Sequence, residues 1–90
     1  MNRARVLLAD DNASFGAEIR GLLEAEFDVV GLVETGEALE EAFTALLPQV
    51  VVTDIAMPGQ GGLVAVRRIR EQYPGTPAIL LTVIDAPISP

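Results

Sequence analysis

The sequence predicts an α/β fold in which a parallel sheet carries helices on both faces. Short, continuous apolar runs alternate with longer segments whose apolar residues recur at helical spacing. Four runs and three segments give the order β-α-β-α-β-α-β, without repeats or low-complexity tracts. This alternation is typical of parallel strands joined by right-handed helical crossovers. The 90 residues suffice for one small domain, which we take as residues 1–90.

Each predicted strand is a short run of aliphatic and β-branched residues. The runs cover Arg5–Ala9, Phe27–Val33, Val50–Asp54 and Ala78–Ile84. A strand that is apolar throughout is typical of a sheet buried on both faces, because successive side chains point to opposite sides.

The predicted helices cover residues 13–26, 36–47 and 63–73. The residues expected to face the sheet are Phe15, Ile19, Leu22 and Leu23 in the first helix, Leu39, Ala42, Phe43 and Leu46 in the second, and Leu63, Val66, Ile69 and Tyr73 in the third. Pro48 closes the second helix, and the Pro-Gly-Thr-Pro segment after Tyr73 ends the third.

Composition excludes several kinds of chemistry. The chain has no Cys and no His, so it cannot use imidazole bases, thiol nucleophiles or the usual zinc ligands. Its net charge of −7 argues against nonspecific nucleic-acid binding by this segment, since phosphate contacts need clustered cations. No apolar run approaches the length of a membrane span, so we expect no membrane association. The chemistry must therefore use carboxylates and hydroxyls.

Polar side chains stand at the ends of three predicted strands. Asp10 and Asp11 follow the first strand, Asp54 ends the third, and Thr82 lies in the fourth. Because the carboxyl ends of parallel strands meet at one edge of the sheet, three carboxylates should converge if the first and third strands are neighbours. Their mutual repulsion favours a bound cation, and oxygen ligands suit Mg²⁺. A carboxylate beside such a metal, with a hydroxyl opposite, provides what phosphoryl transfer to an aspartate requires.

Each of these residues also has a purely structural explanation when it is taken alone. Asp11 or Asn12 could cap the helix that follows. Asp54 could start a turn, and Thr82 could be an ordinary strand residue. Their occurrence together, at the same ends of the predicted strands, favours the functional interpretation.

The segments that contain these residues resemble the receiver-domain signature of bacterial two-component response regulators. The matching segments, at residues 6–12, 52–59 and 79–82, read Val-Leu-Leu-Ala-Asp-Asp-Asn, Val-Thr-Asp-Ile-Ala-Met-Pro-Gly and Ile-Leu-Leu-Thr. Gly62-Leu63, followed by residues 66–70, is similar to the family's third helix, especially in receivers that precede LuxR/NarL-type DNA-binding modules. The resemblance implies a flavodoxin-like (CheY-like) parallel sheet with strand order 2-1-3-4.

The resemblance also implies a role for each site residue. Asp54 would accept the phosphoryl group. Asp11, Asp54 and the backbone carbonyl of Ala56 would bind Mg²⁺ directly, and Asp10 would support the metal, largely through water. Thr82 would hydrogen-bond the phosphoryl group.

Partners and location follow from the same resemblance. A sensor histidine kinase would supply the phosphoryl group, and a longer parent protein could carry a DNA-binding output domain. The chain would be a cytoplasmic signalling phosphoacceptor that catalyses at most its own phosphorylation and dephosphorylation, not a classical enzyme. Met57 and Pro58 would shape the loop beside the site.

Receivers of this family have five strands and five helices, so we expect the chain to be an incomplete, C-terminally truncated receiver domain. The family's lysine and its aromatic switch residue follow the fourth strand, and the chain contains no lysine. In the order 2-1-3-4, the fourth strand would be an exposed apolar edge. We expect a homodimer that covers this edge by strand pairing or by exchange of the C-terminal segment.

Three other functions compete with a phosphorylatable receiver. A degenerate receiver that serves only as a dimerisation module is favoured by the absence of lysine, but the retained aspartates and Thr82 oppose it. A haloacid-dehalogenase-type enzyme needs a second Asp two residues after the nucleophile, where this chain has Ala56. A flavin-binding flavodoxin needs a phosphate-binding loop after the first strand, and that loop is acidic here.

Overall fold

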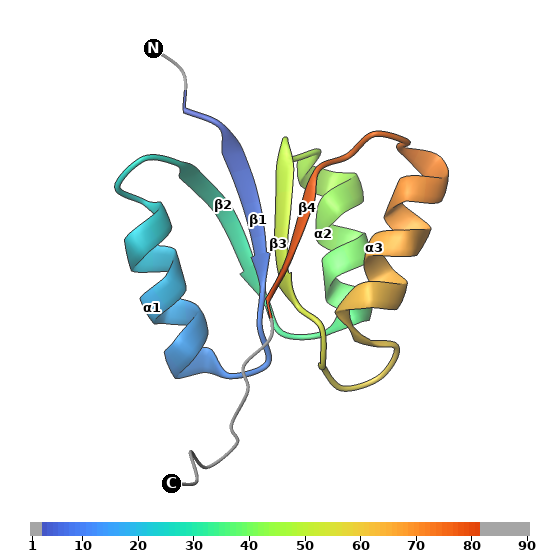
Figure 1. Cartoon of the computed structure of the whole chain (residues 1–90), viewed down its shortest axis with the longest axis horizontal. Coiled ribbons are helices and arrows are strands. Elements are labelled where there is room, and N and C mark those ends of the chain that lie inside the picture. The colour runs from blue at the N-terminus through green and yellow to red at the C-terminus, as the bar shows by residue number, and fades with distance from the viewer. Residues whose placement is uncertain (1–2, 82–90) are drawn as a thin grey trace, which may run out of the picture.

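A computed structural model of the chain describes residues 3–81 (Figure 1). The strands are β1 (Arg5–Ala9), β2 (Asp28–Val33), β3 (Val50–Asp54) and β4 (Ala78–Leu81). The helices are α1 (Ala13–Leu23), α2 (Gly36–Leu46) and α3 (Gly61–Gln72). The predicted alternation of strands and helices is confirmed over these residues, whereas residues 82–84 of the predicted fourth strand lie outside them. No helix in the described range is long and apolar enough to cross a membrane.

All strand pairs are parallel, and the order in the sheet is β2-β1-β3-β4. Figure 1 shows α1 on one face of the sheet, and α2 and α3 together on the other. This arrangement confirms the flavodoxin-like sheet with strand order 2-1-3-4. The central pair, β1 and β3, runs in register from Val6 opposite Val50 to Ala9 opposite Thr53. The carboxyl ends of these two strands therefore lie side by side.

The sheet divides the core into two layers, because side chains alternate between its faces. The larger layer, against α2 and α3, consists of Leu7, Ala9, Leu39, Phe43, Val51, Met57, Ala65, Val66 and Ile69. The smaller layer, on the α1 side, consists of Val6, Leu8, Val29 and Val52. Within the described residues a single helix packs on this second face, which accounts for its smaller buried set.

The inward face predicted for α2 is confirmed, but that of α1 is partly wrong. Leu39 and Phe43 of α2 are buried. In α1, by contrast, Leu22 is 76% exposed, and the only fully buried residue is Gly16. A Cβ at Gly16 would lie 3.2 Å from the side chain of Leu32, so this glycine lets α1 pack closely on β2. The helix is thereby turned so that Leu22 points to solvent.

The face predicted for α3 is also partly wrong. Leu63 was expected to point inward but is 46% exposed. The helix begins at Gly61, and its buried residues are Gly62, Ala65, Val66 and Ile69. Because Gly62 takes the place closest to β3, the neighbouring Leu63 turns outward.

β4 is the edge of the sheet within residues 3–81, where it pairs with β3 alone. Ile79 is 54% exposed and Leu80 is 37% exposed. The expected edge strand with exposed apolar side chains is therefore present in this part of the chain.

Candidate functional site

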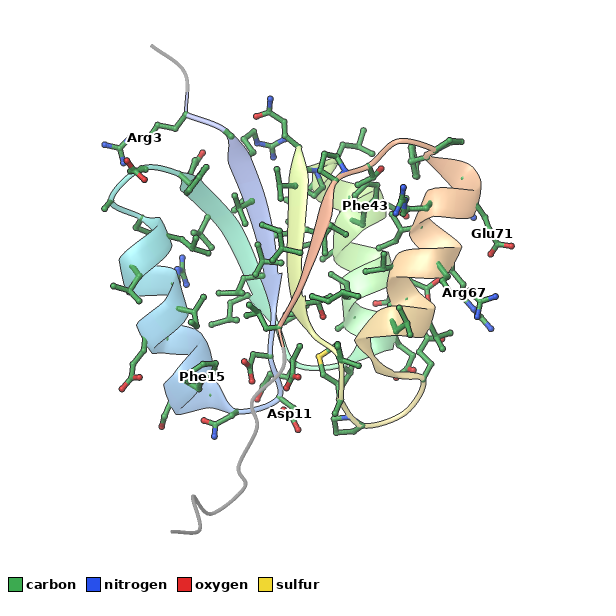
Figure 2. All side chains as sticks on the ribbon, viewed as in Figure 1. Arg3, Asp11, Phe15, Phe43, Arg67 and Glu71 are labelled. Carbon is green, nitrogen blue, oxygen red and sulfur yellow. The ribbon has the colours of Figure 1, made fainter. Side chains whose placement is uncertain are left out.

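Three carboxylates meet at the carboxyl ends of β1 and β3. Asp10 and Asp11 directly follow β1, and Asp54 is the last residue of β3. One oxygen from each of the three lies within 4.8 Å of the other two. Figure 2 shows Asp11 at this end of the sheet, close to the start of α1. The convergence expected from the strand ends is therefore found in the structure.

Asp10 is the buried member of the cluster, with 2% of its surface exposed. Its backbone N–H donates to the carbonyl of Val33 at 2.9 Å, which continues the β1–β2 pairing beyond β1. Its Oδ1 accepts from the N–H of Asn12 at 2.8 Å. Its Oδ2 is buried and has no hydrogen-bond partner among the described residues. A buried carboxylate oxygen without a donor is unfavourable, so Oδ2 marks a place for a cation or an ordered water.

Asn12, and not Asp11, caps helix α1. The side-chain oxygen of Asn12 accepts from the N–H of Phe15 at 3.0 Å. Asp11 is exposed and takes no part in this cap. The structural explanation considered for the two residues therefore applies to Asn12, and the carboxylate of Asp11 is left to the acidic cluster.

Asp54 is half-buried, and its Oδ1 accepts from the N–H of Ala56 at 3.2 Å. Burial raises the pKa of Asp54 above its ordinary value of 3.8, and the nearby charges of Asp10 and Asp11 raise it further. The hydrogen bond from Ala56 acts in the opposite direction, because it stabilises the carboxylate. A bound divalent cation would offset both the burial and the crowding of like charges.

Two residues that sequence reasoning missed hold the backbone of Asp54. Thr53 is completely buried, and its hydroxyl donates to the carbonyl of Asp54 at 3.0 Å. Gly62, in the first turn of α3, lies so close that an added Cβ would overlap the same carbonyl oxygen. In the sequence, Gly62 is noted only as part of the segment that is similar to the family's third helix, with no role at Asp54. Its contact with Asp54 follows from the packing of α3 on β3.

The remaining predicted site residues differ in burial, and one of them lies outside the described range. Ala56 is exposed, and Pro58 beside it is exposed as well. Met57 is buried in the core layer against α2 and α3, where it anchors the loop after β3. Thr82 lies outside the described residues, so its role stays a prediction.

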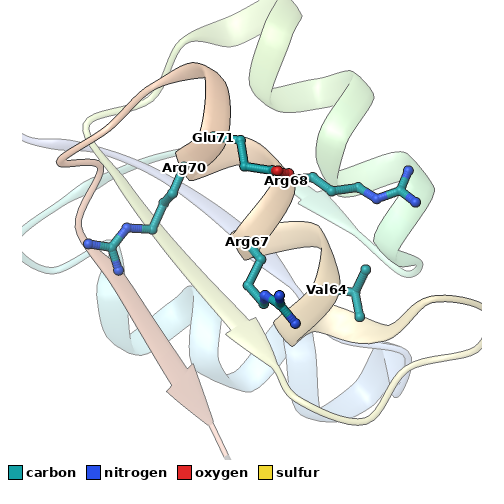
Figure 3. A pocket seen from close by; sticks show the side chains of 5 residues that line it. All are labelled: Val64, Arg67, Arg68, Arg70 and Glu71. Atoms are coloured by element: carbon teal, nitrogen blue, oxygen red, sulfur yellow. The ribbon is translucent and has the colours of Figure 1, made fainter.

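A separate hollow of about 540 Å³ lies on the outer surface of α3 (Figure 3). It is lined by Val64, Arg67, Arg68, Arg70 and Glu71. None of these residues belongs to the acidic cluster. The chemistry expected from the sequence therefore belongs to the strand ends, not to this hollow.

The parallel sheet, with an acidic cluster across its central strand ends, defines a protein of the receiver class. Residues 6–88 match the response regulator receiver domain family, and the chain belongs to that family. It is thus a receiver domain of the two-component response-regulator type.

One curated relative is a much longer protein than this chain. The chain is 39% identical over 84 residues to protein-glutamate methylesterase/protein-glutamine glutaminase 4 of Geobacter metallireducens. The match covers 91% of this chain and 24% of that protein. The chain thus spans about a quarter of the length of this curated relative.

Two solved structures are similar along almost the whole chain. The signal receiver domain of NarL from Mycobacterium tuberculosis has a TM-score of 0.87 and 29% identity, and the match covers 97% of this chain and 72% of that one. RcsB of Salmonella enterica serovar Typhimurium, bound to a promoter in the presence of the phosphomimetic BeF₃⁻, has a TM-score of 0.81 and 31% identity. That match covers 93% of this chain and 43% of the RcsB chain.

Proposed function

We propose that residues 1–90 act as a phosphoacceptor unit that takes a phosphoryl group from a sensor histidine kinase onto Asp54. The observation that carries this proposal is the carboxylate cluster, in which Asp54 has a raised pKa and Asp10 has a buried oxygen without a donor. In the transfer, an Asp54 carboxylate oxygen forms a bond to phosphorus, and the bond from phosphorus to the kinase imidazole breaks. The electron pair of that bond stays on the imidazole nitrogen.

The residues fit a small oxygen-binding cation such as Mg²⁺. Asp11 and Asp54 would bind it directly together with the carbonyl of Ala56, and Asp10 would support it through water. When bound, the cation offsets the negative charge of the incoming phosphoryl group. The N–H of Ala56 holds the Asp54 carboxylate in place. Thr82 is proposed as the hydroxyl that hydrogen-bonds the phosphoryl group.

Related proteins support a regulatory setting for this chemistry. The similarity to RcsB, which was solved on a promoter with a phosphomimetic, supports a DNA-binding output domain in a longer parent protein. We propose that the unit works in the cytoplasm and is not itself an enzyme beyond its own phosphorylation and dephosphorylation. This follows from the family resemblance.

A homodimer through the β4 edge or the C-terminal segment is part of the same proposal. The exposed Ile79 and Leu80 support it, because an apolar edge strand tends to pair with another chain. Light scattering over a hundredfold range of concentration tests the idea. We expect a mass that rises towards twice the monomer, and a concentration-independent monomer would overturn it.

The phosphoacceptor function is tested by intact mass spectrometry after incubation with a small-molecule phosphodonor. We expect a phosphate adduct that requires both Mg²⁺ and Asp54, so that Asp54→Asn and a chelator each abolish it. If folding is confirmed by circular dichroism and no adduct forms, the chain acts instead as a non-signalling interaction module.

A further inference from the structure

The loop between β3 and α3 carries Ala56, whose N–H holds the carboxylate of Asp54. Its backbone hydrogen bonds in the described chain lie at its two ends, where the N–H of Ile55 donates to the carbonyl of Leu81 at 3.1 Å and the N–H of Gly62 donates to the carbonyl of Ile55 at 3.0 Å. Among the described residues, positions 56–60 between these ends make no backbone–backbone hydrogen bond to another segment. Such a loop needs other contacts to keep one conformation. Apart from the buried side chain of Met57, the polar contacts that hold this loop come from helix α2.

We propose that Gln60, together with Glu37 and Glu40, positions the metal-site loop by fastening it to the first two turns of α2. The inference rests on the proposed function, because it assigns these residues a role in setting the geometry of that site. Gln60, Glu37 and Glu40 are positioning residues, since none of them belongs to the acidic cluster.

Gln60 makes two hydrogen bonds to α2. Its backbone N–H donates to Oε1 of Glu37 at 3.3 Å. Its side-chain amide donates to Oε2 of Glu40. The two bonds join residues 23 and 20 positions apart in the sequence, so they are tertiary contacts and not part of a local turn. A residue held at both its backbone and its side chain has little freedom to move.

Close packing between the start of α2 and the loop supports the same attachment. A Cβ at Gly36, the first residue of α2, would lie 2.7 Å from Cγ of Gln60 and 2.8 Å from the carbonyl oxygen of Gly61. Gly59 has φ +79°, and a Cβ there would lie 2.8 Å from Oε1 of Glu37. The glycines let the backbone of α2 and the backbone of the loop approach each other at this point.

The choice of partners suits a site that binds a cation. Gln60 offers two neutral N–H donors, one from its backbone and one from its side chain, so it joins the loop to Glu37 and Glu40 without adding a positive charge. Within residues 3–81 the single ion pair joins Arg20 and Glu24, so no arginine neutralises these two glutamates there. A tether made with arginine would instead place positive charge beside the loop.

The test exchanges the chemical groups of one hydrogen bond. Gln60→Glu sets a carboxylate against the carboxylate of Glu40 and breaks the side-chain bond. The double variant Glu40→Gln with Gln60→Glu restores an amide–carboxylate pair at the same net charge. We expect the single variant to bind Mg²⁺ about tenfold more weakly, because the released loop would hold Ala56, and through it Asp54, less firmly, and the double variant to recover most of this loss.

The sign of the effect separates positioning from simple electrostatics. Gln60→Glu adds negative charge near a cation site, which by itself would strengthen Mg²⁺ binding. Weaker binding by this variant, measured by calorimetric titration, therefore reports loop geometry. Glu41→Gln is the matched control for the Glu40→Gln change in the double variant. Glu41 is an exposed glutamate on α2 that makes no contact with Gln60 among the described hydrogen bonds.

A second measurement needs no metal. In metal-free protein we expect amide hydrogen exchange at Ala56 to be about tenfold faster in Gln60→Glu than in the parent chain, with exchange in β1 unchanged. If Gln60→Glu does not fold, Gln60→Ala serves for both measurements, because it removes the side-chain bond without adding charge. Unchanged Mg²⁺ affinity and unchanged Ala56 exchange in a folded variant would overturn the inference. Failure of the parent chain to bind Mg²⁺, with faster Ala56 exchange in the variant, would instead count against the proposed function alone.

Discussion

Gly62 lies directly against the carbonyl oxygen of Asp54, with no space between them for a side chain. The first turn of α3 is thereby packed onto the residue that carries the proposed phosphoacceptor. We expect Gly62→Ala to lower the free energy of unfolding by about 3 kcal/mol, because the added methyl group must push α3 away from β3. Urea denaturation followed by circular dichroism measures this change.

Gly21→Ala is the matched control for that substitution. Gly21 lies in helix α1, and a Cβ there would meet nothing within 4 Å. Alanine is the better helix former, so we expect this variant to be more stable by about 0.5–1 kcal/mol. Equal effects of the two substitutions would show that the close approach of Gly62 has no energetic consequence.

The stability of the chain should depend on pH through Asp54. Because its pKa is raised in the folded chain, the folded state holds this proton more tightly than the unfolded state does. The contribution of Asp54 to stability is thus fully present below its ordinary pKa of 3.8 and is lost as the pH rises through the folded value. Without divalent metal, Asp54→Asn should raise the melting temperature by a few degrees at pH 7 and change it little below pH 3.8.

Two comparisons make this measurement specific. Asp28→Asn removes a carboxylate from the exposed start of β2, at the opposite end of the sheet, and should not reproduce the gain. Addition of Mg²⁺ should stabilise the parent chain and so reduce the advantage of Asp54→Asn. A fall in melting temperature for Asp54→Asn at pH 7 would contradict the proposed crowding of like charges.

Asp11 and Asn12 are adjacent but should respond differently to substitution. Asn12→Ala removes the cap of α1 and should cost about 1 kcal/mol of stability, with little change in Mg²⁺ affinity. Asp11→Ala should leave the cap intact and greatly weaken Mg²⁺ binding. Thermal unfolding and metal titration of both variants test the division, and a loss of stability in Asp11→Ala as large as in Asn12→Ala would contradict it.

Leucines on two helices provide a test of the packing. Leu39 of α2 is completely buried, so Leu39→Ala should cost about 3 kcal/mol. Leu22 of α1 is 76% exposed, and Leu22→Ala should change stability by no more than about 0.5 kcal/mol. Chemical denaturation measures both. A similar loss for the two variants would mean that Leu22 is covered in solution, for example by a second chain.

Much of the acidic site could be predicted from the sequence because it depends on the ends of strands. The apolar runs that stop at Asp10 and Asp54 are local features, and parallel pairing brings such ends to one edge. The predicted faces of α1 and α3 were less accurate. Leu22 and Leu63 follow helical spacing, but Gly16 and Gly62 take the places closest to the sheet. Periodicity counts apolar residues, whereas contact with a sheet also selects residues small enough to let the backbones approach.

The sequence by itself determined the order of elements, the strand ends that carry carboxylates and the absence of imidazole and thiol chemistry, because these depend on residue type and local spacing. Only the tertiary structure decided that Asn12 is the cap, that Oδ2 of Asp10 is buried without a donor, and that Gln60 is bound to Glu37 and Glu40. The cap is a local choice between Asp11 and Asn12 that the sequence left open. The other two depend on how separate segments pack and orient their side chains. The position of the loop beside Asp54 is therefore a property of the folded chain, since the glutamates that hold it belong to a different helix.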